Sequence, residues 1–326
     1  MTRKIRQGGQ WVQVGGAGIS GIEVIADSDD ATDLGKLYFI TNDSTSSSLT
    51  TFRVNGKLGT GIMFDGSELW APSVQATGGI ESIINVSGTP NRVHTFNSNF
   101  DFEVLVSTLS VEYLVVGGGG GGGNKPVTNY SGAGGGAGGM INGSNLTLNQ
   151  GVYSIVVGNG GSPGNKGEDS SIGNLIVAVG GGRGGSNSAG QAGGSGGGAG
   201  ASNNFGTGIA GQGFNGGSTT NTGPVYLIGA GGGGAGSVGS SISTSAANTP
   251  RANGGLGATS LISGNSKVYA TGGKGGAGSS HAEGNLNGEN GVPNLGNGGG
   301  GAGAGTNASL GGSGGSGIVI IRYPIA

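Results

Sequence analysis

The pattern of hydrophobic and polar positions changes at Val116 and divides the chain there. Before Val116, short runs of alternating or β-branched residues are separated by polar stretches and by dipeptides such as Asn55-Gly56, which favour hairpin turns. These runs predict short strands at residues 11–14, 22–25, 36–41, 50–54, 61–64, 68–72, 80–86, 92–96 and 102–106. Alternation in the strand at residues 92–96 would put Val93 on one face and the strand-face residues His94 and Phe96 on the other. We therefore expect a small β domain at residues 1–75, and a connector with the first strands of a second domain at residues 76–112.

After Val116 one unit recurs: a short β-prone segment runs into a glycine tract. Residues 111–116, for example, precede the uninterrupted glycines Gly117–Gly123. Further β-prone segments at residues 151–157, 174–179, 224–228 and 267–271 also run into glycine tracts, and a final strand is predicted at residues 317–324. Such repetition is typical of stacked units. We expect one glycine-rich domain at residues 113–326.

Glycine makes up 85 of the 326 residues, against a usual share of about 7%. A collagen-like helix is excluded because glycine does not occupy every third position and only 8 residues are proline. Two interpretations stay open: flexible glycine-rich linkers, or a bundle of polyglycine-II helices that bond laterally through N–H and C=O groups. In the bundle, the chain would reverse at inserts such as residues 124–131 and 201–205. The fold class is then all-β, with short strands and a bundle of polyglycine-II helices.

Composition and charge exclude several classes of protein. The formal net charge is −2 with charged residues at 9%, and lysine and arginine do not cluster, so no nucleic-acid partner is expected. Cysteine is absent, which excludes disulfides and thiolate sites. No apolar run approaches the roughly 18 residues of a membrane span, so we expect no membrane insertion. The basic start of the chain is not followed by the apolar segment of a secretory signal.

Candidate catalytic chemistry is sparse. Lys274 lies among glycines but is followed by Gly275, where a phosphate-binding loop needs Ser or Thr. Close carboxylates suit calcium, but the EF-hand spacing is missing and a turn or helix cap is the favoured interpretation for Asp27, Asp29, Asp30 and Asp33. No Ser–His–Asp arrangement is recognisable. We therefore expect no enzyme activity, no cofactor and no metal.

Aromatic residues in polar inserts are the best binding candidates. Aromatic rings stack on sugars or exposed loops, and amides bond to hydroxyl and peptide groups. The predicted receptor-binding residues are Asn129, Tyr130, Asn203, Asn204, Phe205, Phe214 and Asn215. The alternative is that these aromatic side chains anchor the inserts against the bundle. The tyrosines inside β-prone segments are expected in the core instead: Tyr153, Tyr226, Tyr269 and Tyr323.

Two sequence features carry a family resemblance. Residues 92–96 (Arg-Val-His-Thr-Phe) precede residues 111–116 and their glycine run, and the chain closes with Ser-Gly-Ile-Val-Ile-Ile-Arg-Tyr-Pro at residues 316–324. Together they resemble the glycine-rich domain of bacteriophage tail-fibre and other virion proteins, over about residues 78–326. The resemblance implies a β core carrying glycine tracts, as in the polyglycine-II adhesins of T-even-type fibre tips. It also implies a host cell-surface receptor, either a polysaccharide or an outer-membrane protein, as partner.

Residues 1–75 are similar, less specifically, to virion-attachment domains that precede such tips. The resemblance implies contact with other phage tail or virion proteins, and the expected attachment residues are Arg3, Lys4, Arg6 and Trp11. A homotrimer is expected, since fibres are commonly trimeric and a small β domain gains core in that way. We therefore expect a phage tail-fibre adhesin on the virion, released by lysis. The alternatives are a structural head-fibre or decoration protein without a receptor, and an ice-binding protein, which the irregular inserts disfavour.

Overall fold

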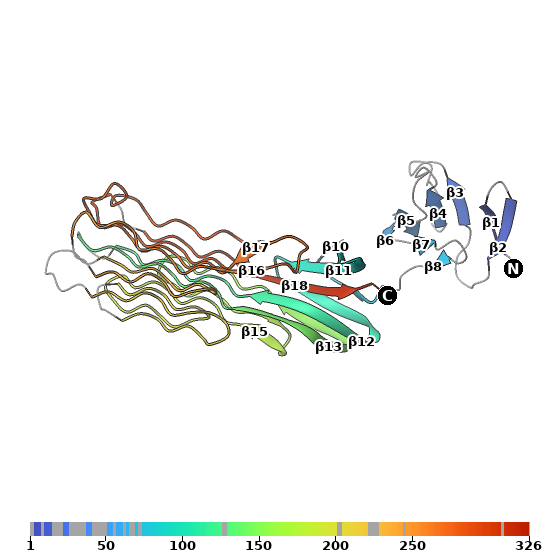
Figure 1. The fold of residues 1–326 in the computed structure, drawn as a ribbon, viewed down its shortest axis with the longest axis horizontal. Helices are drawn as coiled ribbons and strands as arrows, with labels where there is room; N and C mark the ends of the chain where they lie inside the picture. Colours follow the sequence, from blue (N-terminus) through green and yellow to red (C-terminus); the bar gives the residue numbers. More distant parts are fainter. Residues whose placement is uncertain are drawn as a thin grey trace. The chain divides into compact units, whose positions relative to one another are not determined.

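The computed structural model describes residues 74–125, 129–200, 204–220, 228–243, 246–307 and 310–325, together with the strands between residues 3 and 70. The chain divides into two units, Met1–Val74 with Ala326, and Gln75–Ile325. Every regular element in the described part is a β-strand, so the fold is all-β (Figure 1). None of the described elements is a helix long and apolar enough to cross a membrane.

The first unit contains paired short strands. Three pairs are antiparallel: β1 (Arg3–Gln7) with β2 (Gln10–Val14), β5 (Thr51–Val54) with β6 (Lys57–Thr60), and β7 (Met63–Phe64) with β8 (Leu69–Trp70). The fourth pair, β3 (Ile22–Ile25) with β4 (Leu37–Ile40), is parallel. The sequence predicted six of these strands and missed β1 and β6. The side chains of Arg3, Lys4, Arg6 and Trp11 lie outside the described part, as do residues 26–36 with the acidic cluster.

The second unit is built on one antiparallel sheet. Its order is β10-β11-β18-β12-β13-β14-β15, and β9 pairs with β12. The bounds are β9 Ala76–Thr77, β10 Ile80–Val86, β11 Thr89–Phe96, β12 Phe100–Val116, β13 Met140–Val156, β14 Ser170–Ile172, β15 Ile176–Ala178 and β18 Ile318–Pro324. Strand β18, which comes last in the sequence of the unit, therefore lies inside the sheet between β11 and β12.

Strands β12 and β13 are longer than the sequence predicted. Residues 102–106 and 111–116 were expected as separate strands, but they belong to one strand with irregular register between Val104 and Thr108 and between Val111 and Tyr113. The expected domain boundary between residues 112 and 113 falls inside it. Strand β13 begins at Met140, whereas a strand was predicted only from residue 151. Pairing along the whole of β12 holds the polar first half of β13 in the sheet.

The alternation of side chains across the sheet separates two apolar clusters. Phe96, Phe102 and Tyr323 belong to one cluster, and Val93, Leu114 and Tyr269 belong to the other. The prediction that residues 93 and 96 occupy opposite faces is therefore confirmed. The second cluster is completed by the hairpin of β16 (Ala258–Ser260) and β17 (Lys267–Tyr269). Tyr269 and Tyr323 are buried as predicted, Tyr153 is partly buried, and Tyr226 lies outside the described residues.

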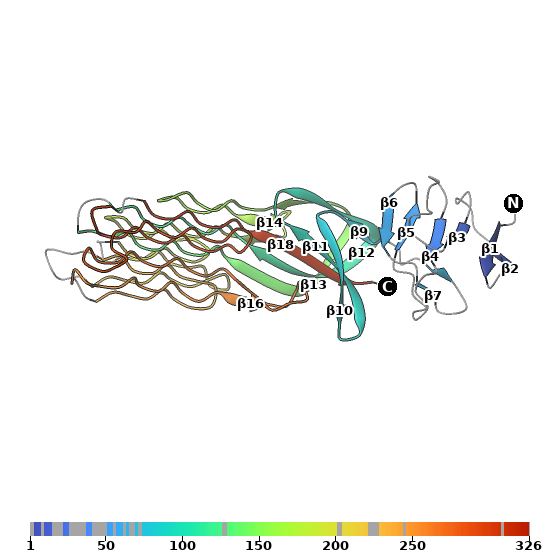
Figure 2. The same cartoon turned by 90° about the horizontal axis from the view of Figure 1, so that it is seen from above.

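The glycine tracts run side by side from one end of this sheet (Figures 1 and 2). Within the tract at residues 117–123, the direction of hydrogen bonding repeats every three residues. The backbone N–H groups of Gly117, Gly120 and Gly123 donate to carbonyl oxygens of residues 139, 136 and 133, those of residues 118 and 121 to residues 168 and 165, and those of residues 119 and 122 to residues 315 and 312. Each successive N–H group therefore reaches a different neighbouring segment.

The carbonyl oxygens of the same tract follow the same period toward other neighbours. The oxygens of residues 118 and 121 accept from residues 181 and 184, those of 119 and 122 from 161 and 164, and those of 120 and 123 from 299 and 302. Donors and acceptors together bind this tract to six segments: 133–139, 165–168, 312–315, 161–164, 181–184 and 299–302. We call this array of hydrogen-bonded tracts the glycine bundle. We call residues 117–123 the central tract. Its N–H groups, and the carbonyl groups of residues 118–123, are satisfied by these bonds although the tract belongs to no strand of the sheet.

The central tract requires glycine because neighbouring tracts leave no room for a side chain. A Cβ atom built on Gly119 would overlap the carbonyl oxygen of Asn297, and one on Gly122 would overlap that of Gly300. Backbone atoms of a neighbouring hydrogen-bonded tract cannot turn aside as a side chain can. The close spacing of the bundle therefore depends on the missing side chains.

Candidate functional site

The chain reverses at the end of the bundle remote from the sheet, which we call the distal end. Gly123 N–H donates to the carbonyl oxygen of Ala133 at 2.8 Å, so the chain reverses its direction between these two residues, as the sequence predicted. Gly206 N–H likewise donates to the carbonyl oxygen of Gly197 at 2.8 Å, so the chain also reverses between these two residues. Residues 126–128 and 201–203, which belong to the two predicted inserts, lie outside the described part. Both reversals connect antiparallel tracts.

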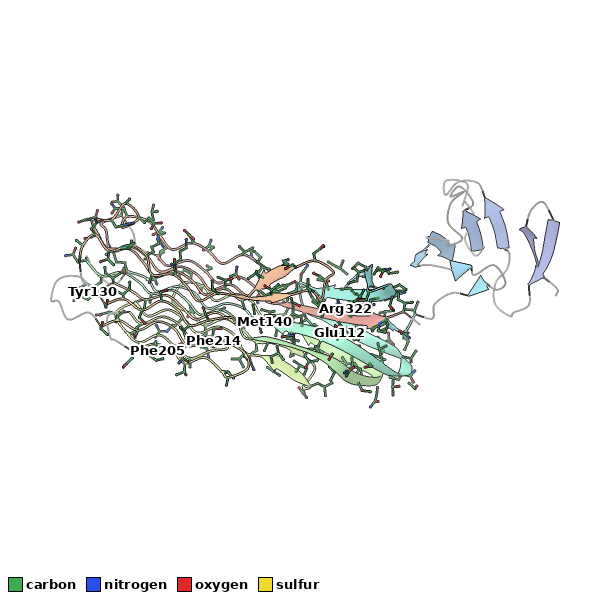
Figure 3. All side chains as sticks on the ribbon, in the orientation of Figure 1. Glu112, Tyr130, Met140, Phe205, Phe214 and Arg322 are labelled. Atoms are coloured by element: carbon green, nitrogen blue, oxygen red, sulfur yellow. The ribbon has the colours of Figure 1, made fainter. Side chains whose placement is uncertain are left out.

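Two of the predicted receptor-binding aromatic residues lie toward this distal end: Tyr130 and Phe205 (Figure 3). The Phe205 side chain is 40% exposed and Asn204 is exposed, whereas Asn129 and Tyr130 are half-buried. Asn129 has a positive φ of 69°, a conformation that asparagine tolerates better than most residues. Asn203 lies outside the described residues. The distal end thus combines an exposed ring with amide side chains.

Phe214 and Asn215 lie elsewhere, where the bundle meets the sheet. We call this the junction end. The preceding turn contacts the start of β13, since Met140 N–H donates to the carbonyl oxygen of Gln212 at 2.9 Å. Figure 3 accordingly shows Phe214 between Phe205 and Met140. The structure therefore divides the predicted receptor-binding residues into a distal group and a junction group.

The junction group borders an open pocket of about 530 Å³. Its lining includes Phe214 and Asn215 together with residues that the sequence did not single out: Met140, Asn142, Val238 and Ala258. These residues come from β13, from β16 and from a turn of the bundle. They lie far apart in the sequence, so no local signal indicated that they meet.

A buried polar contact joins strands β11 and β18 of the sheet. His94 of β11 is 0% exposed and lies between the carbonyl oxygen of Gly78 and the hydroxyl of Tyr323. Because a carbonyl oxygen can only accept, Nδ1–H donates to Gly78 at 2.7 Å and Nε2 accepts from Tyr323 at 3.0 Å. Burial lowers the pKa of His94, against the raising effects of the Gly78 hydrogen bond and Glu81. Burial also raises the pKa of Tyr323 to about 12. The pair is therefore neutral at pH 7, and the prediction that His94 is a strand-face residue is confirmed.

Ion pairs connect neighbouring strands of the sheet. Arg322 of β18 pairs with Glu112 of β12, its partner in the strand register (Figure 3), and also donates to the carbonyl oxygens of Leu261 and Ile262 at 3.2 Å. Arg92 likewise pairs with Glu81 at 2.9 Å. Among the described residues, no group of three or more His, Asp or Glu side chains is arranged to hold a metal ion.

Comparison with known proteins places this architecture in a family. No curated protein matches the chain. The model of a family described as a glycine-rich domain matches residues 94–324, which run from the buried histidine of β11 to the last residue of β18. The matched range contains both the glycine bundle and most of the sheet that closes it. The chain therefore belongs to this glycine-rich domain family.

Proposed function

We propose that this protein is a non-catalytic receptor-binding adhesin of a bacteriophage tail fibre. The observation that carries the proposal is the exposure of Phe205 and Asn204 at a reversal of the glycine bundle, with Tyr130 at the same end. Loops held by a rigid scaffold are where binding residues concentrate. The location on the virion is supported by the resemblance of residues 92–96, 111–123 and 316–324 to phage virion proteins.

In this proposal the glycine tracts are polyglycine-II helices. The three-residue period of their hydrogen bonds supports this, because a polyglycine-II helix has three residues per turn and directs successive N–H groups to different neighbours. The bundle then acts as a stiff support. Its function is to hold the distal reversals in place before the receptor binds, which limits the entropy lost on binding.

The first unit attaches the adhesin to the virion, through Arg3, Lys4, Arg6 and Trp11, and assembles three copies. Three copies on one fibre would present three distal ends, so weak single contacts would add up to strong attachment. Sedimentation equilibrium of the full chain tests the assembly: the mass should be that of three chains, and a monomer would contradict the trimer while leaving receptor binding open.

Binding to bacterial cells tests the function. The fluorescently labelled full chain is incubated with a panel of bacterial strains, and the fraction retained on washed cells is measured. We expect saturable binding to some strains, and competition by their purified surface polysaccharide or loss after protease treatment identifies the receptor class. Phe205→Ala and Tyr130→Ala should each weaken binding at least tenfold.

Phe100→Ala is the matched control, because Phe100 is also an exposed phenylalanine, at 58%, but belongs to the sheet. Its substitution should leave binding unchanged. A folded chain that binds none of the strains would contradict the adhesin and favour a structural head-fibre or decoration protein. Equal losses of cell binding for Phe205→Ala and Phe100→Ala would show that the distal end is not the receptor-binding surface.

A further inference from the structure

The junction pocket has the size and position of a binding site of its own. Its volume of about 530 Å³ lies within the roughly 300–1,000 Å³ typical of small-ligand sites. Met140 forms part of the wall and is only 7% exposed, whereas Phe214 and Val238 are 45% and 56% exposed. The pocket therefore offers exposed apolar surface beside a buried wall.

Gln212 fixes one side of this pocket. Its side-chain oxygen accepts from Val179 N–H at 2.9 Å and its amide nitrogen donates to the carbonyl oxygen of Val177 at 3.2 Å. Its backbone oxygen accepts from Met140 N–H at 2.9 Å. The turn that precedes Phe214 is thus bound to both β13 and the end of β15. A wall held in this way needs little ordering when a ligand binds.

The lining selects for a neutral ligand with hydroxyl groups. None of the residues that line the pocket is charged, so no ion pair is available to offset the desolvation of a charged ligand. Asn142 is exposed on β13, and Asn215 accepts from Gly208 N–H at 2.9 Å through its side-chain oxygen. The NH₂ group of Asn215 can then donate to a ligand hydroxyl. An aromatic ring flanked by amides suits the apolar face and the hydroxyl edge of a sugar.

We infer that the junction pocket binds an uncharged saccharide unit, with Phe214 stacking on the sugar ring and Asn142 and Asn215 bonding to its hydroxyl groups. The inference rests on the proposed function, because it gives the adhesin a second contact with a surface polysaccharide. That contact lies at the junction end, whereas the first contact lies at the distal end. A polysaccharide chain lying along the bundle would bind both.

Neutral and acidic oligosaccharides test this inference. The full chain is titrated with uncharged glucose, galactose and rhamnose oligosaccharides, and with oligosaccharides that carry uronic acid, using calorimetry. We expect binding of at least one uncharged oligosaccharide. Phe214→Ala and Asn142→Ala should each weaken that binding at least tenfold. Both side chains are exposed enough to be replaced without loss of the fold, which thermal unfolding verifies.

Phe100→Ala is the matched control, because its ring is also exposed, at 58%, but belongs to β12 and does not line the pocket. It should leave oligosaccharide binding unchanged. Failure of every uncharged oligosaccharide to bind would overturn the inference, as would binding that Phe100→Ala abolishes and Phe214→Ala leaves intact. A pocket that takes an apolar peptide instead of a sugar would also overturn it.

The two proposals fail differently. If cells are bound through Phe205 but no uncharged oligosaccharide binds at Phe214, the adhesin stands and the saccharide pocket is wrong. If an oligosaccharide binds at Phe214 but no cell is bound, the pocket stands and the adhesin is wrong.

Discussion

The hydroxyl of Tyr323 donates to Nε2 of His94 at 3.0 Å, across a separation of 229 residues in the chain. The two rings also stack, with centroids 5.5 Å apart. Because the glycine bundle lies between these residues in sequence, their contact joins the beginning of the domain to its end. Strand β18 lies between β11 and β12, so the chain from residue 117 to residue 317 must bring its two ends together for the sheet to form.

Removal of the Tyr323 hydroxyl should destabilise the second unit. Tyr323→Phe keeps the ring but leaves the buried Nε2 of His94 without its donor, at a cost of about 1–3 kcal/mol. Tyr153→Phe is the control, because the Tyr153 hydroxyl donates to the Asn149 carbonyl oxygen at an exposed position. Urea unfolding followed by circular dichroism measures both variants, and equal losses would show that the His94 contact does not stabilise the fold.

Stability should fall in mild acid through His94. Burial lowers the pKa of His94 in the folded protein, whereas the unfolded chain keeps the ordinary value of about 6.5. Below that value the unfolded state binds the proton first, so the free energy of unfolding decreases as the pH falls. His94→Gln should remove this part of the pH dependence. Thermal unfolding of both proteins between pH 7.5 and pH 5 measures it, and parallel curves would contradict the prediction.

Alanine should not be tolerated in the central tract. In Gly119→Ala the new methyl group meets the carbonyl oxygen of Asn297, and relief of the overlap would break hydrogen bonds to neighbouring tracts. Overpacking costs about 1–3 kcal/mol, and each lost hydrogen bond adds about 1 kcal/mol. We expect a loss of roughly 3 kcal/mol or more in the free energy of unfolding, measured by urea denaturation.

Gly88→Ala separates this effect from backbone strain. Gly88 has a positive φ of 89°, and nothing lies within 4 Å of the position that its Cβ would take. Its replacement by alanine lowers the free energy of unfolding only by the strain of a left-handed alanine, about 1–2 kcal/mol. A Gly88→Ala loss equal to that of Gly119→Ala would show that close packing is not what requires glycine in the bundle.

Strand positions could be predicted from the sequence where local alternation marks them. The strand predicted at residues 80–86 has the same bounds as β10, and alternation at residues 92–96 placed Val93 and Phe96 on opposite faces, as observed. The first half of β13 could not be predicted, because Asn142 and its polar neighbours are held by pairing with β12. Local preference gave no sign of that pairing.

The candidate site shows the same limit. The residue types at Tyr130, Phe205 and Phe214 identified binding candidates, but the separation of Phe214 from the others could not be predicted. Their positions depend on how far each tract runs before it reverses and on which tracts are neighbours. Glycine has no side chain to mark that register, so only the hydrogen bonds of the folded bundle determine it.

Amide hydrogen exchange at residues 117–139 tests most directly whether the glycine bundle is the rigid support that the proposed adhesin requires. Peptic peptides covering residues 117–139 would be followed by mass spectrometry in the native full chain. Hydrogen bonds to neighbouring tracts at both N–H and C=O groups predict exchange as slow as that of strands β12 and β18, limited by unfolding of the whole unit. Complete exchange within seconds, as in a flexible glycine linker, would contradict the bundle and the adhesin scaffold built on it.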